Sequence, residues 1–261
     1  MTMTNWLINF PDKIAIFILI FIRMISLFVI TPVFGRKEMP AYMKIGFAFF
    51  CTIIIAPMLS NTQLEYTNMI EFAGLVVKEM LVGLIMGYVS FLVFSALYVA
   101  GQIMDMQIGF GMVNVIDPMM GGQVPMMGNF FYILTALFFL MIDGHHILFK
   151  ALFESYSIIP LGGFAFSATL LTNIVNVMAV TFLIGVQISI PILAALLMTE
   201  VGLGILSRTV PQMNVFVIGM PLKIGLGLLT LYFMFPVFFK VMLVLFDKMY
   251  AYLYLIMRSM V

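Results

Sequence analysis

Residues 101–128 of the chain read GQIMDMQIGFGMVNVIDPMMGGQVPMMG, and long apolar segments flank them on both sides. The run contains seven methionines and six glycines but no Lys or Arg. Glycine lets the backbone turn and approach other atoms closely, and methionine fills irregular gaps while tolerating movement. This composition predicts a compliant apolar loop, of the kind that keeps a pore shut and still opens for something large.

The composition of the whole chain indicates a membrane protein. It is 64% hydrophobic and 9% charged, whereas soluble domains are about half apolar and a quarter charged. The formal net charge of +1 gives no reason to expect nucleic-acid binding. Cys51 is the only cysteine, which excludes an intrachain disulfide. No small-residue cleavage site follows the first apolar segment, so we expect a retained helix rather than a signal peptide.

Six hydrophobic segments predict an all-α, multi-helix integral membrane protein, since a spanning helix needs roughly 20 apolar residues. Two segments are short for a bilayer and two are overlong, which favours long, kinked helical hairpins buried against protein. We expect the whole chain, residues 1–261, to form a single membrane domain. The segments are approximately Ile14–Thr31, Ile45–Leu59, Phe72–Ala100, Phe130–Ile142, Ala168–Met198 and Leu222–Phe246.

Prolines and glycines predict details of these helices. Pro191 falls inside the fifth segment and should kink it, while Pro57 and Pro236 are expected near helix ends. Gly83 and Gly87 form a small-xxx-small pair on one face of the third segment, which allows a close helix–helix contact. The alternative is a chance spacing in a glycine-containing membrane helix.

The basic residues give no consistent orientation in the membrane. Those between Arg36 and Lys44 would put the first connection in the cytoplasm and the termini outside, because cytoplasmic loops are enriched in Lys and Arg. Those between Lys240 and Arg258 argue for a cytoplasmic C-terminus. An even number of spans cannot satisfy both, so either the span count is wrong or the chain does not cross a bilayer in the ordinary way.

A second informative stretch, Glu200–Lys223, reads EVGLGILSRTVPQMNVFVIGMPLK and connects two hydrophobic segments. Its Gln and Asn side chains can both donate and accept hydrogen bonds, so they can satisfy backbone groups where a helix is interrupted. Glu200, Arg208 and Lys223 bracket the connection. The plainest interpretation is a capped turn with charges at the membrane surface.

Charged residues within apolar segments are functional candidates by default. Arg23 lies midway through the first segment, and we expect it to contact another subunit or the pore, with snorkelling toward the interface as the alternative. Lys78 and Glu79 open the third segment. Adjacent residues on a helix point about 100° apart, so these two need not pair, and we assign them no function.

Asp143, His145 and His146 invite a metal-site hypothesis, because imidazole and carboxylate bind zinc. Adjacent histidines on a helix point apart, however, and no third strong ligand follows at helical spacing. We therefore predict no metal site and no cofactor. Asp143 is expected to cap a helix that begins near Gly144, and a proton-sensing role for the histidines has no support in the sequence.

Four motifs give the chain a resemblance over nearly its whole length. They are Gly111 followed by Asp117-Pro118, the DGHH run at 143–146, ExGLGxxxR from Glu200 to Arg208, and PQMNVFxxGxPLK from Pro211 to Lys223. In segment order and motif placement the chain resembles the FliR/SctT family of type III export-gate proteins. The last motif is the most specific. The GMPLK ending is closer to the flagellar branch than to SctT, the virulence-injectisome counterpart.

The resemblance implies a structural subunit of the flagellar export gate in the bacterial cytoplasmic (inner) membrane, within the basal body. It implies FliP-like and FliQ-like parts, assembly with FliP and FliQ homologues, contact with FlhB and FlhA, and unfolded exported proteins as cargo. It also implies that residues 109–125 plug the closed pore, through Gly109, Phe110, Gly111, Met112, Asp117, Pro118, Met119, Met120, Gly121, Gly122 and Pro125. The residues implied in assembly are Arg23, Glu200, Arg208, Pro211, Gln212, Asn214, Phe216, Gly219, Pro221 and Lys223.

Other functional classes have less support in the sequence. The chain has no HExxH, GxSxG or P-loop motif, so we predict no enzymatic activity. A small-solute transporter would place several convergent polar groups within its spans, whereas only Arg23, Gln187 and a few Asn, Ser and Thr residues qualify. A third option is an assembly factor that never lines a pore. The methionines could also serve ordinary core packing, since the chain has 26 of them in all.

Overall fold

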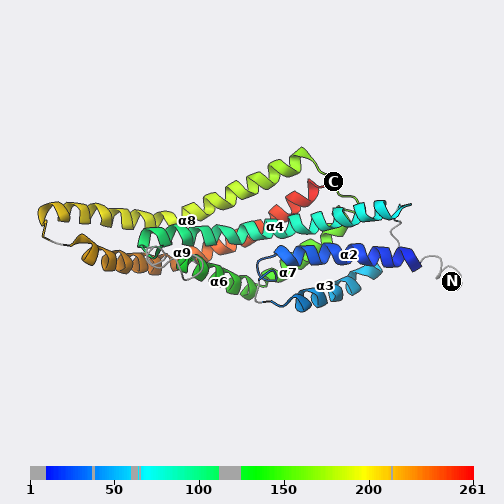
Figure 1. Cartoon of the computed structure of the whole chain (residues 1–261), viewed down its shortest axis with the longest axis horizontal. Helices are drawn as coiled ribbons and strands as arrows, with labels where there is room; N and C mark the ends of the chain where they lie inside the picture. The colour runs from blue at the N-terminus through cyan, green and yellow to red at the C-terminus, as the bar shows by residue number, and fades with distance from the viewer. Residues whose placement is uncertain (1–9, 37–38, 60–63, 65, 112–124, 213) are drawn as a thin grey trace. The chain divides into compact units, whose positions relative to one another are not determined.

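The computed structural model describes residues 10–36, 39–59, 64, 66–111, 125–212 and 214–261, and every regular element in these ranges is a helix (Figure 1). The all-α prediction is therefore confirmed for the described residues. The elements are α2 (Phe10–Ile30), α3 (Ala41–Ile55), the 3-10 turn η1 (Ala56–Leu59), α4 (Met69–Ile108), α6 (Met126–Met141), α7 (Gly144–Ile158), α8 (Ala168–Thr209) and α9 (Val215–Arg258).

Five of the described helical segments are long and apolar enough to cross a membrane, or six if α6 and α7 together make one span. This confirms the prediction of a multi-span membrane protein. The predicted segments were too short at several ends. The helix α4 continues to Ile108, α8 continues to Thr209, and α9 extends from Val215 to Arg258.

The proline predictions had mixed outcomes. Pro57 lies in η1 at the end of α3, as expected. Pro236 was placed near a helix end, and this is wrong because it lies inside α9, as Pro221 also does. Proline removes one backbone hydrogen bond, but a long membrane helix tolerates this because neighbouring groups satisfy the freed carbonyl. Pro191 lies inside α8, and the kink predicted there stays a prediction.

The chain divides into two compact units. Unit 1 comprises residues 1–92, 142–177 and 248–261, and unit 2 comprises residues 93–141 and 178–247. The helices α4, α8 and α9 each contribute to both. The prediction of a single domain over residues 1–261 stays a prediction.

The core of unit 1 depends on a close approach of α4 to α2. A Cβ atom on Gly83 would lie 1.9 Å from Ser26 Oγ and 2.4 Å from the Arg23 carbonyl oxygen. A Cβ atom on Gly87 would lie 3.0 Å from the Leu27 carbonyl oxygen. The predicted small-residue contact is thus confirmed, and it brings α4 close enough to α2 for polar side chains of the two helices to meet.

Candidate functional site

The apolar stretch at residues 101–128 is helical at both of its ends. Residues Gly101–Ile108 form the end of α4 and Met126–Gly128 begin α6, so the predicted loop was too long at both ends. Four of the seven residues between Gly101 and Gly109 are the good helix formers Met and Gln. The helix then stops at Gly109, whose φ of 101° lies in the region that favours glycine.

The buried carboxylate of Asp105 joins the two ends of this loop. Asp105 Oδ1 accepts a hydrogen bond from the Met127 backbone N–H at 2.9 Å, and Oδ2 accepts from Met127 and Gly128 at 3.0 and 3.2 Å. The first N–H groups of a helix have no intrahelical partner and carry a positive partial charge. Asp105 is 4% exposed and satisfies two of them at the start of α6.

Glycines bring the same two helices together one turn away from this contact. A Cβ atom on Gly101 would lie 2.5 Å from the Gly128 Cα atom, so the two backbones touch. Asp105, Gly101 and Gly128 are called the loop base below. Asp105 is not among the functional residues predicted from the sequence. The available signal was a lone carboxylate one turn before the first loop glycine, with a new helix starting after Pro125.

Most of the predicted plug lies outside the described residues, namely Met112, Asp117, Pro118, Met119, Met120, Gly121 and Gly122. Gly109, Phe110, Gly111 and Pro125 are described and mark the two ends of the loop. The Pro125 carbonyl oxygen accepts a hydrogen bond from the Asn129 N–H at 2.9 Å, which starts α6. The plug itself stays a prediction.

The Glu200–Lys223 stretch forms the tip of the hairpin made by α8 and α9 (Figure 1). Lys223 Nζ donates to Glu200 Oε1 across the hairpin, and these side chains are 25% and 41% exposed. The same hairpin lines a pocket of about 300 Å³ together with the loop's first residue, Gly109. The pocket lining includes Gly109 from the predicted plug, and Glu200, Phe216, Gly219 and Lys223 from the predicted assembly residues. Residues of the two predicted sets therefore lie side by side in this pocket.

The remaining assembly candidates lie on the surface of this hairpin. Arg208 lies in the last turn of α8 and is exposed. Pro211 and Gln212 are exposed in the turn, and Pro221 is exposed within α9. Asn214 Oδ1 accepts a hydrogen bond from the Phe216 N–H at 3.1 Å. This confirms that an amide side chain satisfies backbone where the helix is interrupted.

The expected contact of Arg23 with another subunit or the pore stays a prediction, and within this chain Arg23 is buried among groups of unit 1. Its side chain is 0% exposed, and Nε donates to Glu79 Oε2 at 2.5 Å. Nη1 donates to Ser155 Oγ and Nη2 to the Ile159 carbonyl oxygen, both at 3.1 Å. A guanidinium carries five donors in a fixed fork, and packing within unit 1 surrounds it with acceptors.

Glu79 completes this network, although no function was predicted for it from the sequence. Its Oε1 accepts a hydrogen bond from the Gly162 N–H at 2.7 Å. The neighbouring Lys78 donates to the Gly162 carbonyl oxygen at 3.1 Å. The Tyr156 ring lies 4.3 Å from the Arg23 guanidinium carbon. The network joins α2, α4, α7 and the turn after α7, so its role in the chain is to hold unit 1 together.

The Asp143–His146 run differs from expectation in two respects. The helix α7 begins at Gly144, as predicted, but Asp143 has a φ of 56° and its side chain makes no capping hydrogen bond. The imidazole rings of His145 and His146 were expected to point apart. Their centroids are 4.2 Å apart instead, because the backbone leaves a left-handed residue and has only begun its first helical turn.

Comparisons with known proteins agree with the motifs. The family model for bacterial export proteins, family 1, matches residues 14–249. The flagellar biosynthetic protein FliR of Bacillus subtilis is 38% identical over 237 residues, which cover 88% of this chain and 90% of the relative. FliR of Pectobacterium carotovorum is 28% identical over 238 residues, covering 90% and 89%. FliR of Escherichia coli is 28% identical over 207 residues, covering 79% of each chain. The chain therefore belongs to family 1 of the bacterial export proteins, the family that contains the flagellar biosynthetic protein FliR.

Proposed function

We propose that residues 109–125 of this chain, a subunit of the flagellar export apparatus, plug the channel through which unfolded flagellar subunits cross the cytoplasmic membrane. The observation that carries the proposal is the loop base. Asp105 and the Gly101–Gly128 contact hold the two ends of the loop together within unit 2. A loop anchored in this way can move without separating the helices that carry it.

The composition of the loop suits a seal. Its methionines are flexible and apolar, so they can fill a gap of irregular shape and repack after it opens. Its glycines leave little side-chain bulk to displace. The hairpin pocket beside Gly109 adds an apolar surface next to the loop, which includes Leu203 and Phe216.

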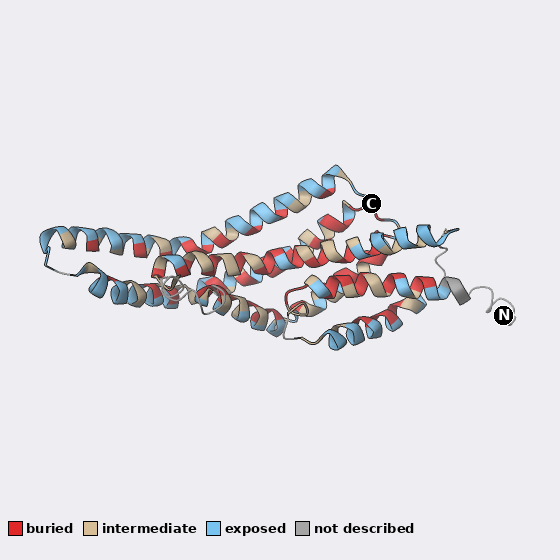
Figure 2. Cartoon of the chain, in the orientation of Figure 1, coloured by how far each residue is buried: buried red, intermediate tan, exposed pale blue. Residues whose placement is uncertain are grey.

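Exposed apolar faces support assembly with other membrane subunits. Several side chains near the hairpin tip are more than half exposed, including Met198 at 76%, Phe216 at 75% and Val217 at 67%. Figure 2 shows this end of α8 and α9 as mostly exposed. Such faces contact either lipid or protein. We propose FliP and FliQ homologues as the proteins that cover them, with FlhB and FlhA as further partners in the basal body and no catalytic role for this chain.

The test of assembly is the mass of the intact complex. The chain would be co-expressed with its FliP and FliQ homologues and purified in mild detergent through a tag on this chain. We expect a discrete complex with one copy of this chain and several copies of each partner. A lone monomer or homodimer would contradict the gate proposal and favour a small-solute transporter.

The plug is tested by replacing residues 110–124 with a Gly/Ser linker of equal length. The loop base remains intact in this variant, so we expect normal assembly with a leak of small ions through the membrane. The measurement is ion conductance of the assembled complex in lipid bilayers. A matched control replaces Thr62 and Gln63 with Gly and Ser, at a place in the sequence far from the proposed plug. Unchanged conductance in a correctly assembled complex would remove the plug from the proposal while leaving the assembly intact.

A further inference from the structure

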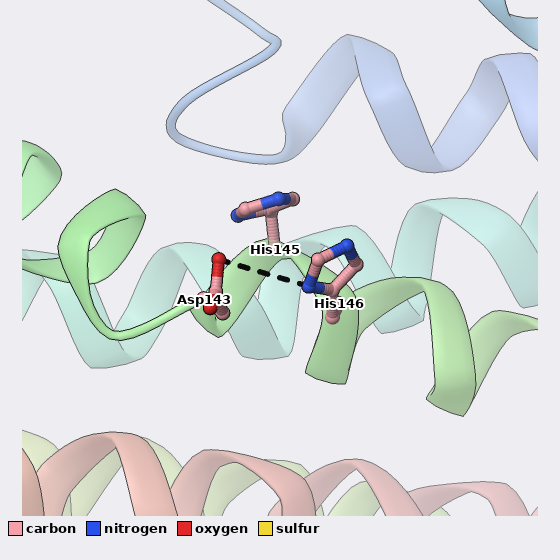
Figure 3. A group of neighbouring side chains, drawn as sticks. All are labelled: Asp143, His145 and His146. Atoms are coloured by element: carbon pink, nitrogen blue, oxygen red, sulfur yellow. Dashed lines mark ion pairs between the residues drawn. The ribbon is translucent and has the colours of Figure 1, made fainter.

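A group of three potential metal ligands lies at the start of α7. Asp143, His145 and His146 each offer one ligand atom, and these atoms lie within 4.8 Å of one another. Figure 3 shows the three side chains arising from the same short segment. All three belong to unit 1, and none of them takes part in the loop base or the hairpin pocket. The proposed export function therefore leaves this group unexplained.

The three side chains do not satisfy one another's polar atoms. His146 Nδ1 and Asp143 Oδ1 lie 3.8 Å apart, which is within ion-pair range but too far for a hydrogen bond (Figure 3). His145 Nδ1 is buried and has no hydrogen-bond partner. Buried polar atoms of this kind are uncommon in folded proteins and call for an explanation, such as an ion. Asp143 also occupies the capping position of α7 without capping it.

We propose that Asp143, His145 and His146 bind a divalent first-row transition-metal ion of the Zn²⁺, Co²⁺ or Ni²⁺ type. Two imidazole nitrogens and one carboxylate oxygen suit these ions, whereas Mg²⁺ and Ca²⁺ prefer sites built from oxygen alone. The three donors occupy three coordination positions and leave at least one to water. The imidazoles bind such an ion in their neutral form and the carboxylate binds it ionised. The positive charge of the ion therefore attracts all three groups, and none of the three repels another.

The geometry requires only a small side-chain adjustment. Bonds of about 2.0–2.1 Å in a tetrahedral site place ligand atoms roughly 3.3 Å apart, so the 3.8 Å between His146 Nδ1 and Asp143 Oδ1 must shorten. The side chains of His146 and Asp143 are 71% and 73% exposed and can rotate toward His145. The side chains must therefore move toward the ion as it binds. Because this movement costs free energy, we expect a lower metal affinity than that of a rigid structural zinc site.

Calorimetric titration with ZnCl₂ tests the proposal. The full chain is purified in detergent through a tag that contains no histidine. We expect one ion per chain, and we expect Asp143→Asn and His146→Asn each to weaken binding by at least ~10-fold, because even outer-shell changes weaken metal sites by 10–100-fold. Asp247→Asn, which alters an exposed carboxylate elsewhere on the chain, is the matched control and should bind like the parent.

A second readout identifies the ligands directly. Co²⁺ replaces Zn²⁺ in such sites and gives visible absorption bands that change when a nitrogen ligand is lost. We expect these bands in the parent chain and weaker, shifted bands in His145→Asn. No saturable Zn²⁺ binding, or binding that persists unchanged in a His145→Asn/His146→Asn double variant, would overturn the proposal. Asp143 and His146 are exposed, so folding of their variants can be verified independently by helical content and elution volume.

Discussion

Replacing Glu79 with Ala is expected to destabilise the chain by about 3–5 kcal/mol, the range seen when one partner of a buried ion pair is removed. The reason is the position of Arg23, whose side chain is 0% exposed and would remain charged without its carboxylate. Ser155 and the Ile159 carbonyl would still accept hydrogen bonds but carry no compensating negative charge. The measurement is the midpoint of thermal aggregation and the denaturant midpoint of the chain in detergent.

Two comparisons separate loss of the ion pair from loss of side-chain volume. Glu71→Ala removes an exposed carboxylate near the start of the same helix, which accepts hydrogen bonds from Thr67, and should cost about 1 kcal/mol, well below the effect of Glu79→Ala. The double variant Arg23→Met/Glu79→Leu removes both charges, and apolar replacements of buried pairs are often neutral or stabilising. We therefore expect it to recover most of the stability. A double variant as unstable as Glu79→Ala would contradict an electrostatic origin.

Replacing Gly101 with Ala is expected to weaken the loop base and lower protein export. The new Cβ atom would lie 2.5 Å from Gly128 Cα and 2.6 Å from Gly128 N, which are backbone atoms that cannot rotate away. The helices α4 and α6 must then separate, and overpacking of this kind costs typically 1–3 kcal/mol. The same movement would lengthen the hydrogen bonds that Asp105 accepts from Met127 and Gly128.

Gly225→Ala provides the matched control for this substitution. Gly225 lies inside α9, and an added Cβ atom there has nothing within 4 Å. Alanine favours a helix over glycine by roughly 0.5–1 kcal/mol, so this variant should be as stable as the parent or more so. Stability by thermal aggregation and export of flagellar subunits into the medium would be compared for both. Equal behaviour of the two variants would show that the loop base does not depend on backbone contact.

The sequence allowed the fold class to be predicted because hydrophobic length is a property of each segment by itself. The six segments were found in the right places, and Gly83 and Gly87 correctly predicted a close helix contact. Helix ends were harder to predict, since Gly101 suggested the start of a loop although α4 continues through it to Ile108 and packs against Gly128 there. Pro236 was misplaced for the same reason: the surrounding helix outweighs the local signal of one proline.

The candidate sites depended more on contacts between distant residues. Arg23 and Glu79 are 56 positions apart, and nothing in either local segment indicates that α2 and α4 bring them together. Asp105 was missed because its partners are backbone N–H groups, so the only signal was its position one turn before Gly109. The sequence correctly placed the Glu200–Lys223 connection between two hydrophobic helices. It could not show that Glu200 and Lys223 pair beside Gly109.

Asp105 holds the two ends of the loop together, and this affects how many residues the chain can carry between positions 109 and 125. Once the ends of a loop are fixed, the entropy of closing it grows only logarithmically, by about 0.6 kcal/mol for each doubling of length. Folding of unit 2 therefore places little limit on how many residues the loop contains. If residues 109–125 plug the channel as proposed, the number of residues between these positions is set by the gap that they fill, which is a requirement of transport rather than of stability.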